Sequence, residues 1–527
     1  MAQPLTRRGF VKASLAGSLA AMGAGALAAE ANKRRKPNLL FLWTDEQRPD
    51  TMAVYGNTKI HAPNLNKFTE ECVVFKNAYD AQPVCTPART CVMTGLWPHQ
   101  SGMVKNNLIL SKDIPCVPEI INDPDYRTAY MGKWHLGDEL YPQHGFQEWA
   151  SIEDIYTSGF TPGRDKNDRS DFHHYLLERG QKPGDDGKFS RDFVSKLPLE
   201  LSKPKFLEGK ACDFLRRHRD EPFMLYVNFL EPHMPYYGPL NAEHDPGQVN
   251  YPANFEYPLP DDEPAKYRRM QEAFRKKECK DEESLRAAIA RYWGLVTEVD
   301  LSVGAILKTL DDLGLADNTL VVYTSDHGDM MGSHGLMAKS VMYQEAIRVP
   351  WMMRVPWMGR KQVVVDQPVS HIDLVPTVLD LMGHAPEERL SGRSLVPLIQ
   401  GGQPAEGHVF VEWNVGDTAK APKAVGEGKK NAAADTKKKN KAKAAEGEGE
   451  SEGGDGKSGN PRFRAVIAPD GWKLSLSDSD KNQLFNLSKD PGELQNLFGK
   501  KEYEDVQRRL TEKIHQWQEK VKDSVKV

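Results

Sequence analysis

Short runs of consecutive apolar residues, each followed by polar or acidic side chains, recur along the first three quarters of the chain. Residues 37–43 form one run that stops at Thr44-Asp45-Glu46, 223–229 form a second, and 319–325 form a third that stops at Asp326-His327. Such runs are typical of parallel strands that are buried on both faces and carry functional residues at their carboxyl ends. Amphipathic helical patterns alternate with them. The alternation predicts an α/β domain over residues 37–400, with helices on both faces of a sheet.

The pattern changes near residue 405. Short β-rich runs cover 408–413, 463–468 and 472–476, with a turn between the last two, and a helical amphipathic pattern covers 503–521. Hairpins followed by an amphipathic helix are typical of a small α+β unit. We therefore predict a second, smaller domain over 405–527, with an antiparallel sheet and a closing helix.

Residues 418–460 interrupt this second domain with a block of different composition. Its first half is rich in Lys and Ala, including Lys437-Lys438-Lys439, and its second half is rich in Gly and Glu. Such a sequence cannot bury an apolar core, so we expect a disordered insertion. Its charges are compatible with a passive solvated loop and with a polyelectrolyte tether to a wall or polysaccharide.

The first residues of the chain have the pattern of a targeting segment. Thr6-Arg7-Arg8-Gly9-Phe10-Val11-Lys12 precedes a weakly apolar stretch over 13–29. This predicts a twin-arginine signal peptide over 1–28, cleaved after passage through the twin-arginine translocase, and a periplasmic or extracellular protein. A membrane anchor is the alternative. However, the stretch is shorter than the ~20 strongly apolar residues of a span, so we expect no stable membrane span after cleavage.

Composition narrows the function classes. The 527 residues include 70 basic and 74 acidic side chains, for a net charge of −4. This balance offers no general attraction to nucleic acid, so we expect no nucleic-acid partner. Apolar residues make up 39% of the chain, which is enough for a sizeable core, and six cysteines are too few for a disulfide scaffold.

The most specific motif is Cys85-Thr86-Pro87-Ala88-Arg89, which continues to Thr94-Gly95. Thr86 can cap a short helix and Pro87 can take its first position. Cys85 would then lie at a helix N-terminus, where unpaired N–H groups and the helix dipole favour an anion. Arg89, one turn further, adds a forked cation. A structural thiol at a helix start is the alternative from these five residues alone, but CxPxR followed by Thr-Gly resembles the type I sulfatases of the alkaline phosphatase superfamily.

The resemblance implies an alkaline phosphatase-like fold, with a large mixed, mostly parallel sheet sandwiched by helices. It also implies that a formylglycine-generating maturation enzyme oxidises Cys85 to formylglycine. One hydroxyl of the hydrated aldehyde would attack sulfur and displace the alcohol, and the other would collapse to the aldehyde and expel sulfate by C–O cleavage. The five other cysteines are then bystanders, and we expect few or no disulfides.

Acidic residues and a histidine at two strand ends predict a metal site. Asp45 and Glu46 end the first run, and Asp326 and His327 end the third. Ordinary polarity beyond a strand is the alternative for each pair alone, but together they can hold a hard divalent cation that polarises a sulfate oxygen. The resemblance implies Ca²⁺ here, with the Cys85 side chain as a further ligand. Because Glu46 is longer than the commoner Asp and His327 adds a nitrogen, Mn²⁺ or Mg²⁺ remains open.

A second motif, Gly132-Lys133-Trp134-His135-Leu136-Gly137, resembles the family segment whose lysine and histidine hold the sulfate and the formylglycine hydrate. These residues are Lys133 and His135. An isolated lysine or histidine is usually a solvated cation or an ordinary polar contact, but the glycine-bounded spacing favours the functional interpretation. We expect His135 to act as the base that removes the hemiacetal proton during sulfate release.

Two further segments complete the resemblance. His233, in Glu231-Pro232-His233, matches the histidine that faces the leaving-group oxygen and is the expected acid for the departing alcohol. Lys339 matches the lysine that bridges sulfate and leaving group. A sulfate ester in its transition state requires cations around it, and Arg89, Lys133 and Lys339 would provide them. Asp326 is a further candidate acceptor for the proton of the attacking hydroxyl, and we assign structural or indirect roles to His99, His334 and His371.

Residues 482–493 resemble a phrase common near sulfatase C-termini, so the likeness covers nearly the whole mature chain apart from 418–460. The leading hypothesis is an exported sulfuric-ester hydrolase acting on a sulfated carbohydrate, with aromatic and polar residues of 236–267 lining the substrate cleft. A phosphonate monoester or phosphodiester hydrolase of the same superfamily is one alternative. A catalytically silent polysaccharide-binding protein with the same scaffold is another.

Overall fold

The computed structural model describes residues 36–277, 281–385, 387–402, 406–414 and 460–527. The predicted signal peptide, 1–28, lies outside the described residues, as does the predicted insertion 418–460 except for Asn460. The boundary between the two predicted domains stays a prediction, because residues 403–405 are also outside. Among the helices of the described part, none is both long and apolar enough to cross a bilayer.

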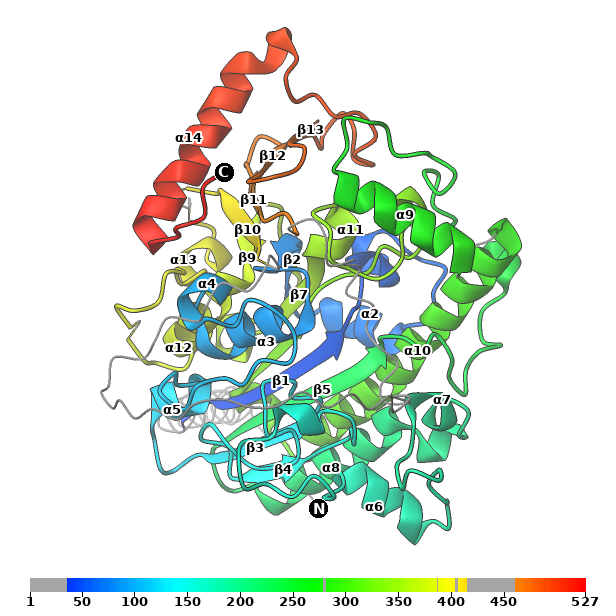
Figure 1. Ribbon diagram of the computed structural model, residues 1–527. Helices are drawn as coiled ribbons and strands as arrows, with labels where there is room; N and C mark the ends of the chain where they lie inside the picture. The colour runs from blue at the N-terminus through cyan, green and yellow to red at the C-terminus, as the bar shows by residue number, and fades with distance from the viewer. Residues whose placement is uncertain (1–35, 278–280, 386, 403–405, 415–459) are drawn as a thin grey trace, which may run out of the picture.

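A large mixed sheet forms the centre of the molecule (Figure 1). In the described residues it has nine strands in the order β4-β3-β5-β1-β6-β7-β2-β8, with β9 pairing with β2. Neighbouring strands are parallel except where β7 pairs with β6 and with β2. The strands are β1 Asn38–Asp45, β2 Val73–Tyr79, β3 Arg127–Gly132, β4 Glu148–Ala150, β5 Phe223–Pro232, β6 Thr319–Ser325, β7 Arg348–Arg354, β8 Val363–Val365 and β9 Val369–Ser370.

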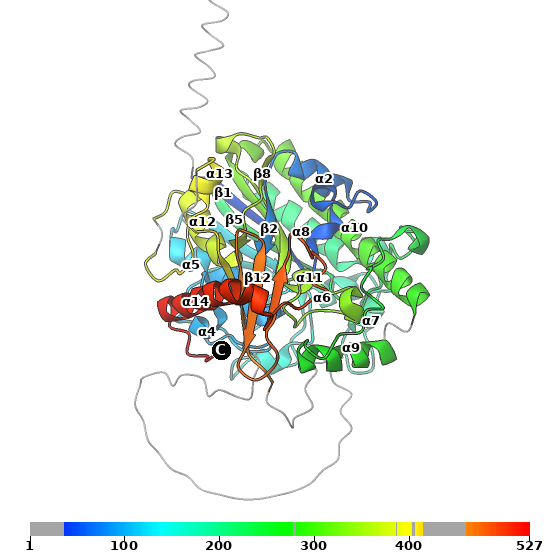
Figure 2. The same ribbon diagram turned by 90° about the horizontal axis from the view of Figure 1, so that it is seen from above.

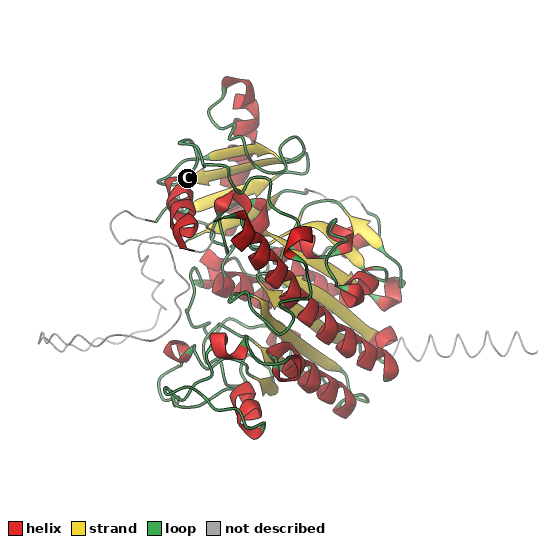
Figure 3. Ribbon diagram, turned by 90° about the vertical axis from the view of Figure 1, so that its right-hand side faces the viewer, coloured by secondary structure: helices red, strands yellow, loops and turns green. Residues whose placement is uncertain are grey.

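Helices cover both faces of this sheet (Figure 3). Alternate residues of β1 enter different cores: Leu40 and Leu42 pack with α2, α6, α7, α8 and α10, whereas Leu39 and Phe41 pack with α3, α5, α12 and α13. Burial on both faces is why the apolar runs are continuous. The helices are α2 Pro63–Thr69, α3 Cys85–Thr94, α4 Pro98–Ser101, α5 Val117–Ile121, α6 Asp171–Glu178, α7 Arg191–Val194, α8 Lys203–Arg217, α9 Ala265–Lys277, α10 Glu282–Asp312, α11 Gln344–Ile347, α12 Leu374–Leu381, α13 Val396–Ile399 and α14 Glu504–Val521.

A smaller antiparallel sheet follows, and α14 closes it (Figure 2). Its strands in the described part are β10 Val409–Trp413, β11 Phe463–Ile467, β12 Trp472–Ser477 and β13 Gln483–Asn486. Leu510 and Ile514 of α14 pack on Val466 and Leu474 of the sheet. The predicted fold class, a mixed, mostly parallel sheet between helices with a smaller antiparallel sheet and a closing helix, is therefore confirmed.

The carboxyl ends of β3 and β5 approach each other closely because of one glycine. Gly132 ends β3 with φ +113°, and a Cβ placed on it would lie 1.8 Å from the carbonyl oxygen of Asn228. Only glycine tolerates both this backbone conformation and this approach. The residues that follow Gly132 are thereby held against β5.

His371 follows β9 and precedes α12, and its side chain is buried against the central sheet. Its Nε2 lies 2.9 Å from the Thr324 hydroxyl oxygen, and its ring packs edge-on against Trp351. The ring is fully buried, and burial lowers the pKa of His371 to about 3. The neutral form is therefore the folded form at physiological pH.

This burial predicts acid sensitivity. The unfolded chain binds a proton at His371 below its ordinary pKa of 6.5 while the folded chain does not, so its contribution to stability is complete above pH 6.5 and is lost as pH falls towards 3. Two pH units below 6.5 cost about 2.7 kcal/mol. We expect His371→Gln to flatten the fall in unfolding free energy between pH 6.5 and 4.5 by about this amount.

Denaturant unfolding at each pH checks the prediction. His174→Gln, at an exposed histidine, is the control and should follow the unmodified protein. An equally steep fall in the His371→Gln variant would contradict it.

Candidate active site

Cys85 lies at the N-terminus of α3, as predicted, but the helix begins two residues earlier than predicted, at Cys85 itself. Val84 occupies the cap position, with extended backbone and no side-chain hydrogen bond, so Thr86 and Pro87 lie inside the first turn. Pro87 is tolerated there because N–H groups of the first turn have no helical partner. The Thr86 hydroxyl instead donates to the carbonyl of His135 at 2.9 Å and accepts from the N–H of Asn107 at 3.3 Å. Thr86 thus ties α3 to the loop after β3.

Two buried cations and two buried acids lie beside the Cys85 thiol. The Lys133 Nζ is 3.8 Å from the Cys85 Sγ and 2.7 Å from Asp45 Oδ2. Arg89 contacts Asp45 Oδ2 through Nη2 at 2.8 Å and Asp326 Oδ2 through Nε at 3.0 Å. All four charged side chains are fully buried. Burial alone would raise the pKa of Asp45, but Lys133, His233 and Arg89 hold it well below its usual range.

Asn228, on β5, completes the setting of Arg89. Its side-chain oxygen accepts from Arg89 Nη1 at 2.9 Å, and the same Nη1 donates to the carbonyl of Lys133 at 2.7 Å. Arg89 therefore contacts both acids, Asn228 and the Lys133 backbone, and it orients the acids and that backbone. No local motif marks Asn228 in the sequence, because it lies within an apolar run.

Four of the predicted metal ligands form one group. One ligand atom each from Asp45, Cys85, Asp326 and His327 lies within 4.8 Å of all the others. His327 Nδ1 donates to the Gly328 carbonyl at 2.9 Å, so Nε2 faces the group. The distance from His327 Nε2 to Cys85 Sγ is 3.3 Å, and to Asp326 Oδ1 it is 3.7 Å.

Glu46, the fifth predicted ligand, belongs to a neighbouring group with Asp45 and His233. Its Oε2 lies 3.0 Å from Lys339 Nζ and 3.4 Å from His233 Nε2. Its Oε1 is buried without a hydrogen-bond partner in the described part of the chain. Burial raises the pKa of Glu46 well above its usual range. A hard divalent cation would provide a partner for this buried carboxylate oxygen and for the neighbouring acids. The residues present therefore fit a metal.

The loop after β3 carries Lys133 and His135. His135 has φ +58°, its Nε2 lies 2.9 Å from Asn107 Oδ1, and its ring stacks on Tyr156 with centroids 4.2 Å apart. The Glu139 carboxylate accepts the backbone N–H groups of Trp134 and His135, and burial raises the pKa of Glu139 to about 7. No motif or spacing in the sequence points to Asn107, Glu139 or Tyr156.

His233 and Lys339 lie on the other side of Glu46. His233 Nδ1 lies 2.8 Å from the Met234 carbonyl, so its Nε2 faces Glu46 and Lys339, with 3.1 Å between His233 Nε2 and Lys339 Nζ. Lys339 stands between Ala338 and Ser340, which both have positive φ. All ten predicted site residues therefore come together at the carboxyl ends of β1, β3, β5 and β6.

Three other histidines lie outside this cluster, as expected. His99 Nδ1 lies 2.7 Å from Glu412 Oε2, His334 stacks on Tyr343, and His371 contacts Thr324. Each makes a contact within the fold. The described cysteines apart from Cys85, which are Cys72, Cys91, Cys116 and Cys212, are all buried and free of disulfides.

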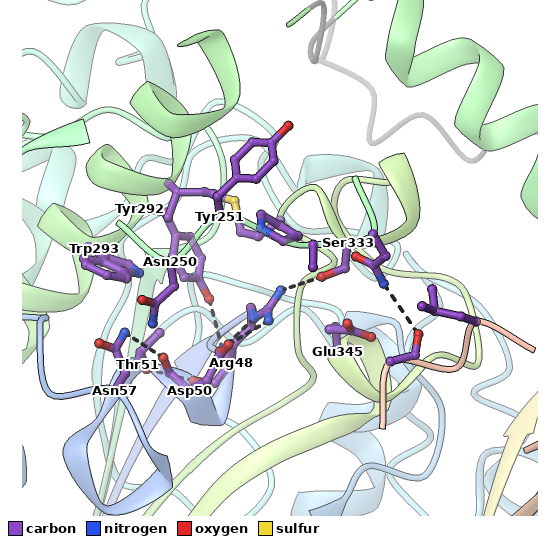
Figure 4. Close-up of a pocket in the computed structure, with 17 residues that line it drawn as sticks. Arg48, Asp50, Thr51, Asn57, Asn250, Tyr251, Tyr292, Trp293, Ser333 and Glu345 are labelled. Atoms are coloured by element: carbon purple, nitrogen blue, oxygen red, sulfur yellow. Dashed lines mark hydrogen bonds and ion pairs between the residues drawn. The ribbon is translucent and has the colours of Figure 1, made fainter. Parts of the chain in front are cut away.

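A pocket of about 310 Å³ adjoins the cluster and is lined in part by residues of the segment 236–267 (Figure 4). Asn250, Tyr251 and Trp293 line it together with the Arg48–Asp50 ion pair. The hydroxyl of Tyr292 donates to the Glu46 carbonyl at 2.7 Å, so the pocket wall contacts the backbone of the cluster. That this segment lines a substrate cleft stays a prediction.

Comparison with known proteins identifies a family and related sequences. A family model described as sulfatase matches residues 37–384. The ulvan-active sulfatase of Formosa agariphila is 27% identical over 490 residues, which cover 91% of this chain and 80% of the relative.

Solved structures share the fold. The crystal structure of a phosphonate monoester hydrolase of Agrobacterium radiobacter has a TM-score of 0.70 at 22% identity, over 92% of this chain and 96% of that chain. A structure in complex with its substrate D-glucosamine-2-N,6-O-disulfate has a TM-score of 0.67 at 21% identity, over 93% and 99%. Both likenesses bear out the predicted fold class.

Proposed function

Because the chain belongs to the sulfatase family and is a sulfuric-ester hydrolase, we propose that it is exported and removes sulfate from a sulfated carbohydrate. We further propose that formylglycine made from Cys85 is the nucleophile and that a divalent metal assists it. The observation that supports this most directly is the setting of the Cys85 Sγ, 3.3 Å from His327 Nε2 and 3.8 Å from Lys133 Nζ, among buried acids.

Asp45, Asp326 and His327 would hold the metal, with the unpartnered Oε1 of Glu46 as a further oxygen and the Cys85 side chain beside them. Three carboxylates favour Ca²⁺, and the His327 nitrogen leaves Mn²⁺ and Mg²⁺ as alternatives. When bound, the metal supplies polarisation of a sulfate oxygen and a lower pKa for the attacking hydroxyl.

The other site residues would bind the sulfate group and transfer protons. Lys133, anchored by Asp45, and Lys339, anchored by Glu46, would bind the sulfate oxygens and stabilise the charge that develops on them. His233 would donate a proton to the departing alcohol through the Nε2 that faces Lys339. His135, oriented by Asn107 and Tyr156, would remove the proton that precedes sulfate release, and Asp326 is a candidate acceptor from the attacking hydroxyl.

The substrate class is proposed from two relatives and one pocket. One relative is an ulvan-active sulfatase, and one solved structure of the same fold holds a sulfated glucosamine. The pocket beside the cluster combines amide, acidic and aromatic side chains, which suit the hydroxyl groups and apolar faces of sugar rings. Export by the twin-arginine route would bring such an enzyme to polysaccharides outside the cytoplasm.

Oxidation of Cys85 is directly measurable. In the active protein, mass spectrometry of the peptide across Val84 to Arg89 should show a residue about 18 Da lighter than cysteine, as the aldehyde requires. Cys85→Ala should lower kcat by at least about 1000-fold while the fold persists. Cys212→Ser, at a buried thiol of α8 outside the cluster, is the control and should retain activity. An unmodified Cys85 thiol in the active enzyme would contradict the proposed mechanism.

Metal binding should stabilise the fold. After chelation, Ca²⁺ at one hundred times its Kd should add about 2.7 kcal/mol of unfolding free energy, because only the folded chain gathers the ligands. Asp326→Asn should reduce this gain, whereas Glu70→Gln, at an exposed acid, should not. Thermal unfolding with and without the ion measures the effect, and an equal gain in both variants would place the ion elsewhere.

A substrate panel tests the reaction and the substrate class. Sulfate release from defined sulfated saccharides should exceed, in kcat/KM, hydrolysis of bis(4-nitrophenyl) phosphate, and should exceed release from choline sulfate. A preference for the phosphodiester by orders of magnitude would replace the proposal with the phosphodiester hydrolase alternative. Undetectable turnover together with an unmodified Cys85 and no metal binding would favour the silent binding protein.

A further inference from the structure

The loop after β3, residues 132–139, carries Lys133 and His135 on a strained backbone. Two of its residues other than glycine, His135 and Asp138, have φ of +58° and +45°. Residues with a Cβ adopt this conformation at a cost in free energy, so it persists only where surrounding groups hold it. The groups that hold this loop therefore determine where the Lys133 and His135 side chains lie.

Glu139 ends the loop and holds its backbone at two consecutive peptide groups. The Glu139 Oε1 accepts the Trp134 N–H at 2.8 Å, and the Oε2 accepts the His135 N–H at 2.6 Å. Both peptide groups adjoin Trp134, which stands between Lys133 and His135. Glu139 is 1% exposed, so water does not compete for these bonds. One carboxylate thus fixes the backbone on both sides of Trp134.

The charge of Glu139 has no cation paired with it in the part of the chain that the structure describes. Lys133, whose charge lowers the pKa of Glu139, pairs with Asp45 at 2.7 Å instead. A buried carboxylate without a cation is unfavourable unless hydrogen bonds offset its desolvation, and here the loop N–H groups provide them. Trp149 of β4 donates from Nε1 to the Glu139 carbonyl at 3.0 Å. Glu139 therefore links the loop to the edge of the central sheet.

The ionised form of Glu139 is the one that fits the loop. Protonation turns one acceptor oxygen into an O–H donor, which weakens one of the two bonds. The pKa of Glu139 is about 7, because burial raises it most, the two backbone bonds and Lys133 lower it, and Glu153 raises it. Tyr130 of β3 also interacts with this carboxylate, but burial raises the pKa of Tyr130 well above its usual range, so Tyr130 stays neutral. The hold on the loop therefore changes around neutral pH.

We propose that Glu139 is a positioning residue of the sulfatase reaction and that it keeps Lys133 and His135 in place through the backbone of the loop. Glu139 acts on the loop and not on the substrate. The Lys133 Nζ lies 3.8 Å from the Cys85 Sγ, so a small shift of the loop would move this cation away from the reacting atoms. The inference rests on the roles proposed above for Lys133 and His135, and it adds the group on which their placement depends.

The substitution Glu139→Gln keeps the size of the side chain but replaces one acceptor oxygen with an NH₂ donor that faces an N–H group of the loop. At about pH 8.5, kcat on 4-methylumbelliferyl sulfate should fall about tenfold, which is the effect of losing one bond to a buried group. Mass spectrometry should show that the oxidation of Cys85 is unchanged.

Asp300→Asn is the matched control for this loss of a buried acceptor. Asp300 is also a buried carboxylate that accepts two backbone N–H groups, those of Asn64 and Leu65. Its substitution should lower the unfolding free energy and leave kcat unchanged. An equal loss of kcat in Glu139→Gln and Asp300→Asn would mean a general structural effect and would overturn the proposal.

The pH profile separates positioning from a purely structural role. As pH falls to about 5.5, protonation of Glu139 weakens the same bond in the unmodified protein, so its kcat should approach that of Glu139→Gln. The ratio of the two kcat values should shrink from about ten to about two, because the other titrating groups are common to both proteins. For Asp300→Asn, the ratio should not change with pH. A Glu139→Gln ratio that is independent of pH would overturn the proposal.

Hydrogen exchange tests the two bonds without turnover. In Glu139→Gln, the backbone amides of Trp134 and His135 should exchange at least about tenfold faster than in the unmodified protein, and in Asp300→Asn they should not. Unchanged exchange at these amides would overturn the proposal, and so would faster exchange with unchanged kcat. Full kcat in Lys133→Ala and His135→Ala would instead contradict the proposed function, whereas the exchange result would stay the same.

Discussion

The pairing of four fully buried charges holds the site and the fold together. Asp45, Arg89, Lys133 and Asp326 come from the end of β1, the first turns of α3, the loop after β3 and the end of β6. Charges without water are tolerated only when they are paired and hydrogen-bonded, so none of these elements can be displaced without leaving an uncompensated charge. The same buried charge pairs therefore maintain both the chemistry of the cluster and the packing of the four elements.

Much of this arrangement could be predicted from local sequence. The runs that became β1, β5 and β6 are continuous because both faces of the sheet are covered, and their polar ends had to meet at one edge. Residues such as Asn228, Asn107 and Tyr156 could not be predicted, since each acts through a partner far away in the sequence. The cap of α3 is Val84, two residues before the predicted Thr86, because the Thr86 side chain bonds to the backbone of another loop rather than to its own helix. Glu46 lies in a group with Asp45 and His233, and Lys339 Nζ lies 3.0 Å from its carboxylate.

The C-terminal sheet supports the cluster from a distance. Lys266 of α9 is buried, its Nζ lies 3.6 Å from the centre of the Trp413 ring of β10, and it donates to the carbonyl of Ser340. Burial lowers the pKa of Lys266 well below its usual range. Ser340 follows Lys339, so contacts with α9 and with the edge of the smaller sheet hold the backbone that carries Lys339. Contacts of α9 with the smaller sheet and with Ser340 therefore help to position the Lys339 side chain proposed to bind the sulfate.

The antiparallel direction of β7 places three site residues on one connection of the chain. A parallel neighbour of β6 would require the chain to cross back to the opposite edge of the sheet before pairing. Because β7 runs against β6, residues 326–347 leave and re-enter the sheet at the same edge. Asp326, His327 and Lys339 therefore share one uninterrupted connection. A single reversal of strand direction thus lets one loop contribute a candidate proton acceptor, a nitrogen ligand and a cation, and it frees that loop to change length without disturbing a crossover helix.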